Sequence, residues 1–208
     1  MPAVSARRTG DRRLDPRERP RGSGRLGPLG GVATRGRIPT LILDDGEPLI
    51  DSAAILDHLD ELVGPDRALL PARGAERRRA LQVIALAAGG IDKAAAYAYE
   101  RQLRPPGMAF APWLERCLVQ LETGLDALEA ATPETGWYLG RGPLQPDITV
   151  GCMLGYVDLR MRDVLPAGTT SPAKHPRLAR LAADLDRVPA FRDTRPSDDE
   201  AKPGRPLA

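Results

Sequence analysis

Residues 36–56 constrain the fold more than any other stretch, because three local signals follow one another there without conflict. Two apolar, partly β-branched runs, 40–43 and 49–50, flank an Asp-Gly pair, which is a strong hairpin-turn signal. Asp51 and Ser52 then stand where a helix should begin, ahead of apolar residues at helical spacing. The stretch therefore predicts a two-stranded hairpin followed directly by a short amphipathic helix.

The remainder of the chain predicts helices and no further strand. Apolar residues at helical spacing indicate four helices, over 75–103, 112–131, 146–164 and 176–187. For the first of these helices, the residues predicted to face inward are Leu81, Ile84, Ala88, Ile91 and Ala95. Gly89-Gly90 is a place where that helix could bend or break. A short turn is expected at 189–191.

Composition shifts mark the segments that flank these elements. Residues 1–35 are rich in Arg, Gly and Pro and show no helical or strand period, which predicts a disordered or irregular tail. Residues 197–208 are predicted to be a frayed tail. Ten arginines and three acidic residues lie within 1–37, so the rest of the chain is mildly acidic although the formal net charge is +2. We therefore expect no nucleic-acid partner.

No apolar run is long enough to span a membrane, and no apolar leader region follows Arg7-Arg8. The expectation is a cytoplasmic protein with no membrane partner. Cys117 and Cys152 are expected to be buried, reduced thiols on two of the helices. His58 and His175 are too isolated in the sequence to indicate a metal or a catalytic base, so surface or cap roles are expected.

Five pieces of the sequence together resemble the soluble glutathione S-transferases of bacterial type. They are GRIPTL at 36–41, LIDSAAIL at 49–56, YLG…PDI over 138–148, HPRL at 175–178 and RVPAF at 187–191. The resemblance implies an α+β fold, with a partial thioredoxin-like N-terminal half-domain (β-hairpin plus helix) at 36–65 followed by an all-α C-terminal helical bundle at 75–196.

The resemblance also implies a glutathione site on the first half-domain. Pro39 would be a cis-proline that turns the backbone of Ile38 outward, so that its N–H and C=O pair with the cysteinyl part of glutathione. Asp51 would pair with the α-ammonium of the γ-glutamyl group, and Ser52 at the helix N-terminus would favour its α-carboxylate. From the residues alone, the favoured interpretation is that Asp51 and Ser52 are helix caps, and the resemblance reverses that preference.

Two further roles are implied for residues outside that half-domain. A second-substrate pocket would be set by Tyr97, Tyr99 and Glu100, whose alternative is ordinary packing on a helix face. Asp147 would be the acidic half of a capping box for a buried helix. Because the matching N-cap position is Leu144, only the Asp147 half of the box remains, and weaker capping is expected.

The family's usual thiol-activating Tyr, Ser or Cys follows a first strand, and residues 1–35 contain no such pattern. The catalytic residue is therefore unassigned, and we interpret these residues as a misread start or a degenerate segment. Two functions follow. One is conjugation of the glutathione thiolate to a small apolar electrophile by a homodimeric, metal-free enzyme. The other is a catalytically degenerate, transferase-like binding or structural protein.

Overall fold

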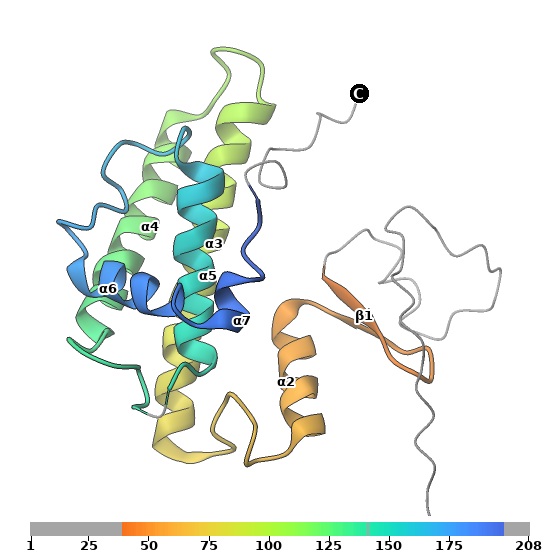
Figure 1. Cartoon of the computed structure of the whole chain (residues 1–208). Helices are drawn as coiled ribbons and strands as arrows, with labels where there is room; N and C mark the ends of the chain where they lie inside the picture. Colours follow the sequence, from red (N-terminus) through yellow and green to blue (C-terminus); the bar gives the residue numbers. More distant parts are fainter. Residues whose placement is uncertain (1–38, 141, 198–208) are drawn as a thin grey trace, which may run out of the picture. The chain divides into compact units, whose positions relative to one another are not determined.

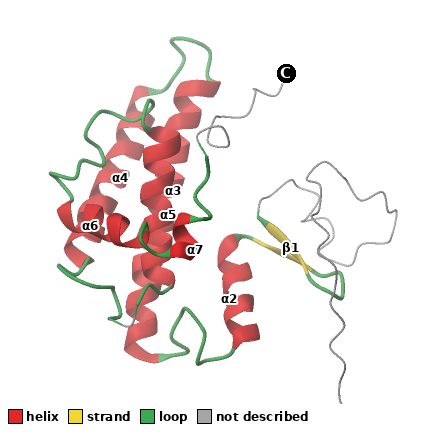
Figure 2. Ribbon diagram, in the orientation of Figure 1, coloured by secondary structure: helices red, strands yellow, loops and turns green. Residues whose placement is uncertain are grey.

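The structure is a computed structural model that describes residues 39–140 and 142–197, and it is α+β, as the sequence predicts (Figures 1 and 2). The elements in chain order are β1 (Thr40–Ile42), β2 (Pro48–Ile50), α2 (Ser52–Val63), α3 (Gly74–Leu103), α4 (Ala111–Ala131), α5 (Gln145–Met161), α6 (Pro176–Leu185) and α7 (Pro189–Arg192). The chain divides into two units between Asp57 and His58, within α2. The predicted tail at 1–35 lies outside the described residues, and so does the predicted tail at 197–208 apart from residue 197.

The predicted hairpin is present. Strands β1 and β2 pair antiparallel with Leu41 opposite Leu49. The turn is closed by hydrogen bonds from the Leu43 N–H to the Glu47 carbonyl and from the Gly46 N–H to the Leu43 carbonyl, both 2.9 Å. Gly46 has φ +88°, a left-handed conformation that glycine adopts without steric cost. The Asp-Gly pair therefore forms the tight turn that joins the two strands of the hairpin.

Helix α3 runs without interruption through Gly89-Gly90, but the predicted inward face is wrong by one residue. Its buried residues are Ala80, Val83, Ala87, Gly90, Ala94, Tyr97 and Ala98, whereas Leu81 is 43% exposed. The reason is that α3 packs through its smallest side chains. A Cβ on Gly90 would lie 2.9 Å from the Met153 sulfur of α5. The close approach of the neighbouring helix, and not side-chain hydrophobicity, therefore determines which face of α3 is buried.

The core of the helical unit lies between α3, α4, α5 and α6. Helix α4 supplies Leu121, Leu125 and Leu128, each at most 1% exposed, and α6 supplies Leu178, Leu181 and Leu185. Pro112 and Pro176 occupy the first turns of their helices, where a missing N–H costs nothing. Among the described residues, no helix is both long and apolar enough to cross a membrane.

Three local predictions need correction. Helix α5 ends at Met161 and not at 164, because the Met161 carbonyl accepts the Val164 N–H as well as the Leu165 N–H, in a tightened turn ahead of Pro166. Helix α6 likewise ends at Leu185 and not at 187. Cys117 is buried as expected, but Cys152 is exposed on α5.

Candidate functional site

Pro39 and Asp51, two of the predicted glutathione-binding residues, are adjacent at the open end of the hairpin. The Asp51 N–H donates to the Pro39 carbonyl at 3.1 Å, which continues the β1–β2 pairing by one more contact. Ile38, the residue whose backbone is predicted to face the ligand, lies outside the described residues. The structure therefore brings together one side of the predicted site, namely the carbonyl of Pro39 and the start of α2.

Asp51 has φ +76°, the only positive φ of a non-glycine residue in the part of the chain that the structure describes. Such a conformation costs about 1 kcal/mol or more and persists only where neighbouring contacts fix it. Here the Asp51 N–H is bound by Pro39, its carbonyl accepts the Ile55 N–H at 3.2 Å, and its carboxylate accepts the Ala53 N–H at 3.2 Å. The carboxylate is thereby held at the N-terminus of α2.

Ser52 is the first residue of α2 and is exposed. The first N–H groups of a helix lack intrahelical acceptors and carry the positive end of the helix dipole, so this position attracts a carboxylate. The junction thus presents two opposite charge preferences. Asp51 supplies an anion for a ligand ammonium, and the helix N-terminus at Ser52 supplies donors for a ligand carboxylate.

The three residues predicted for a second-substrate pocket have different environments on α3. Tyr97 is buried, and its hydroxyl oxygen accepts an Arg101 hydrogen bond at 3.3 Å. Tyr99 is 59% exposed. Glu100 is engaged by its own neighbours, since its Oε1 accepts the Phe110 N–H at 3.1 Å and Arg104 Nε at 3.2 Å. Of the three, Tyr99 presents the most surface to a ligand.

Asp147 is completely buried at the first turn of α5. Its Oδ2 accepts the Leu144 N–H at 3.0 Å, and because a leucine side chain has no acceptor, only this half of a capping box exists. Its Oδ1 accepts the Tyr138 N–H at 3.0 Å, a bond that the sequence did not reveal. Burial raises the pKa of Asp147, and the backbone hydrogen bonds partly oppose that rise. Asp147 joins the 137–140 turn to α5.

His175 is buried at the N-cap of α6, so the predicted surface role is wrong and its cap position is right. Its Nε2 lies 2.9 Å from the Asp126 carboxylate of α4, and this hydrogen bond is the main cause of a lowered pKa for Asp126. Glu129, one turn further along α4, accepts the N–H groups of Arg177 and Leu178, both at 3.0 Å. The Glu129 carboxylate of α4 therefore caps the N-terminus of α6.

Sequence reasoning missed Asp126 and Glu129, although a signal was present. Each acid directly follows an inward-facing leucine of α4, at Leu125 and Leu128. An acid at the border of a buried face needs a donor nearby, and the open N–H groups of another helix are one such donor. The paired acids could have been read as caps for a neighbouring helix.

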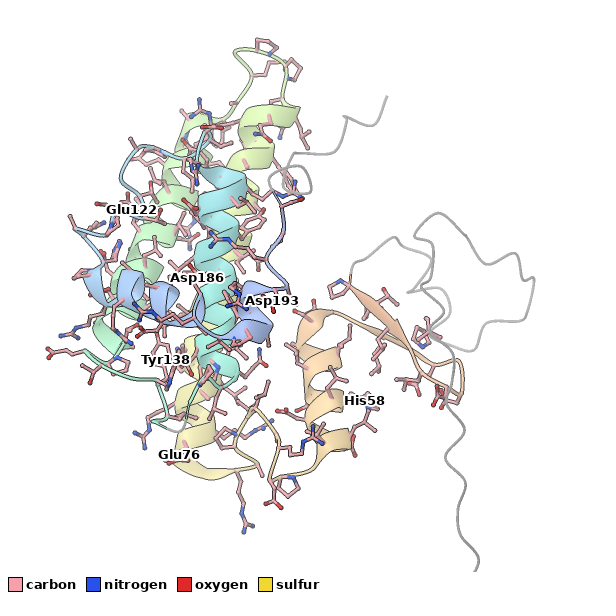
Figure 3. All side chains as sticks on the ribbon, viewed as in Figure 1. His58, Glu76, Glu122, Tyr138, Asp186 and Asp193 are labelled. Carbon is pink, nitrogen blue, oxygen red and sulfur yellow. The ribbon has the colours of Figure 1, made fainter. Side chains whose placement is uncertain are left out.

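A groove of about 1290 Å³ runs along α5, α6 and α7 within the helical unit. Its wall includes Ile148, Cys152 and Tyr156 of α5, and Asp186 and Asp193 lie among its charged residues (Figure 3). The described residues contain no group of three or more His, Cys, Asp or Glu side chains that could hold a metal ion.

Comparison with protein families gives two matches in the order of the two units. The model of the glutathione S-transferase N-terminal domain matches residues 31–67, and that of the glutathione S-transferase C-terminal domain matches residues 111–183. A two-stranded hairpin with a capped helix, followed by a helical bundle, thus corresponds to the thioredoxin-like and helical parts of that fold.

Similar proteins extend the match over most of the chain. An uncharacterized GST-like protein of Escherichia coli K12 is 30% identical over 77% of this chain and 76% of its own. A maleylacetoacetate isomerase of Pseudomonas aeruginosa PAO1 is 30% identical over 81% of this chain and 76% of its own. The crystal structure of a glutathione S-transferase from Methylobacillus flagellatus KT with glutathione bound is 34% identical, covers 82% of this chain and 81% of that chain, and superposes with a TM-score of 0.71. The chain belongs to the glutathione S-transferase family.

Proposed function

We propose that the protein binds glutathione at the junction of the hairpin and α2, and conjugates its thiolate to a small apolar electrophile. The observation that carries the proposal is Asp51, held at φ +76° with its carboxylate at the start of α2. Strain of this kind is concentrated at ligand sites, where the position of one side chain matters more than its conformational energy. The glutathione bound in the Methylobacillus flagellatus relative supports the choice of ligand.

Each end of glutathione has a proposed partner. The cysteinyl backbone pairs with the backbone of Ile38, next to a cis Pro39, as an added strand would. The γ-glutamyl ammonium pairs with the Asp51 carboxylate, and the γ-glutamyl carboxylate accepts donors from Ser52 and the first turn of α2. Both charges of the zwitterionic group are then met within two consecutive residues.

Binding alone does not make the thiol reactive. A free thiol has a pKa near 8.5, and lowering it by two units requires about 2.7 kcal/mol of preferential stabilisation of the thiolate. The residue that supplies this is unassigned. The activity proposed here depends on such a group, which makes turnover the decisive measurement.

Tyr97, Tyr99 and Glu100 are proposed to shape the second-substrate pocket, with Tyr99 making the direct contact because it is the most exposed of the three. We also propose a cytoplasmic homodimer that requires no metal. These proposals rest on the family and not on a measured assembly.

Two alternative functions remain as specific candidates. A transferase-like binding or structural protein without chemistry is favoured by the unassigned thiol-activating group. A glutathione-dependent isomerase is favoured by the 30% identity to a maleylacetoacetate isomerase. Assays with maleylacetoacetate and with chlorodinitrobenzene separate these readings.

The test is retention of the full chain on immobilised glutathione, together with both assays. Retention with chlorodinitrobenzene turnover supports the transferase, turnover of maleylacetoacetate alone supports the isomerase, and retention without turnover supports the binding protein. Asp51→Asn should weaken retention about tenfold or more, because it removes the anion opposite the ligand ammonium. Asp44→Asn is the matched control, since Asp44 is exposed in the same hairpin. Equal retention of the two variants would contradict the proposed site.

A further inference from the structure

The connection between α3 and α4 carries four large apolar side chains on its outside, which we call the apolar tip. They are Leu103, Met108, Phe110 and Trp113, with exposed fractions of 70%, 66%, 63% and 36%. Figure 1 shows this connection at one end of the helical unit. Large exposed apolar side chains gathered at one end of a helix pair are candidates for an interaction surface.

The loop that displays the tip is fixed by polar contacts. Glu100 Oε1 accepts both the Phe110 N–H at 3.1 Å and Arg104 Nε at 3.2 Å, which ties the start of α4 to the end of α3. The Met108 N–H donates to the Pro105 carbonyl at 3.0 Å, and Gly107 turns the chain at φ +80°. The outward direction of the tip is therefore built into the loop.

Basic side chains surround the tip. Lys93 lies over the Trp113 ring at 5.6 Å from its centroid. Arg101 and Arg104 are exposed in the turn before the loop, and Arg116 is exposed in the first turns of α4. The acids in this stretch are Asp92 and Glu115, which are exposed, and Glu100, which is bound to Arg104 and to the backbone. The tip thus combines apolar side chains with four basic and three acidic residues, a small excess of positive charge.

The area of the tip decides between two partners. The four exposed side chains offer roughly 500 Å². A stable protein interface buries about 800 Å² on each partner over matched surfaces. The tip is too small for that, and two of its side chains, Met108 and Phe110, project from the loop between the helices. A bilayer surface accepts projecting side chains one by one, favours Trp and Phe at the headgroup level, and attracts Arg and Lys when its lipids are anionic.

We propose that the apolar tip docks the protein on the surface of an anionic phospholipid bilayer, with Met108 and Phe110 at the boundary of headgroups and acyl chains. The arginines would contact headgroup phosphates. This is surface contact and not a membrane span, and it differs from the sequence expectation of no membrane partner. It goes beyond the proposed function and is independent of the glutathione site, so either proposal can fail alone.

The test is co-sedimentation of the full chain with vesicles of phosphatidylcholine alone and of phosphatidylcholine mixed with phosphatidylglycerol. We expect partition onto the mixed vesicles that weakens with added salt. The double variant Met108→Ser, Phe110→Ser should reduce the partition coefficient about tenfold or more. Val119→Ser is the matched control, because Val119 is 55% exposed on α4 outside the tip. Circular dichroism should be unchanged in both variants, since all three positions are exposed.

A second measurement does not depend on these substitutions. Trp137→Phe leaves Trp113 as the only tryptophan, and its emission should shift to shorter wavelength on mixed vesicles. Absence of both partition and shift overturns the proposal, as does an equal loss of partition in Val119→Ser. If sedimentation velocity instead shows self-association that the double variant removes, and no vesicle binding, the tip is an interface between copies and the proposal is wrong.

Discussion

The two units of the molecule differ in how much they bury. In the helical unit, three leucines of α4 and three of α6 are at most 1% exposed, around an α3 face of alanine and glycine. In the described part of the hairpin and in α2, by contrast, no residue is buried. A two-stranded hairpin is marginal on its own in water. The difference teaches that the helical unit carries the stability, while the proposed glutathione site lies where stability is lowest.

The largest expected effect is in the core. Leu121→Ala should lower the free energy of unfolding by about 3 kcal/mol, because the side chain is completely buried and leaves a cavity. Leu49→Ala, at a half-buried strand position, should cost less than about 1 kcal/mol. Urea unfolding followed by circular dichroism measures both. Equal costs would show that the hairpin is packed as tightly as the bundle.

Asp147→Ala should cost about 2 kcal/mol and leave glutathione retention unchanged. The substitution leaves the N–H groups of Leu144 and Tyr138 without their acceptor, and the site at Asp51 is on the other unit. Thermal unfolding and the glutathione resin measure the two quantities separately. Weaker retention at full stability would contradict a purely structural role for Asp147.

Gly46→Ala should destabilise the hairpin by about 1 kcal/mol, because an L side chain is strained at φ +88°. The unfolding transition of the helices should be unchanged, while glutathione retention should fall. Glu47→Ala is a control in the same turn with a backbone that tolerates any residue. A shift of the helical transition would show that the two units unfold together.

The smallest effect concerns acid stability. The hydrogen bond from His175 lowers the pKa of Asp126 in the folded protein, so its contribution to stability is present above the unfolded pKa and is lost as the pH falls through the folded pKa. Asp126→Asn should flatten the loss of stability below about pH 4. Urea midpoints at acidic and neutral pH measure it. An unchanged slope would mean that other carboxylates dominate acid unfolding.

The elements that could be predicted from the sequence are those whose signals are local. The Asp-Gly turn, the helix start at Asp51 and Ser52, and the apolar spacing that predicts each helix act within a few residues. The face of α3 could not be predicted, because Leu81 is more apolar than Ala80 and only contact with α4 and α5 favours the smaller residue inward.

The candidate site combines local signals with contacts that no local signal predicts. The pattern of a helix start predicted Asp51 and Ser52 at the beginning of α2, and the family resemblance implied their ligand roles, but the positive φ of Asp51 and its contact with the Pro39 carbonyl were not predicted. Glu129 caps α6 by accepting the N–H groups of Arg177 and Leu178, which lie 48 and 49 positions further along the sequence. No periodic pattern within a helix encodes such a pair.

The alanine and glycine face of α3 has a consequence for how this protein can change. Most cores lose stability when a large side chain is truncated, but Ala87 and Ala94 are fully buried and carry only a methyl group that could be removed. Added methylenes there must separate the helices, and a Cβ on Gly90 already requires the Met153 sulfur to move. Ala→Gly on this face would cost about 1 kcal/mol of helix propensity, so neither smaller nor larger residues are accommodated freely, and the spacing of the helices is what selection would have to preserve.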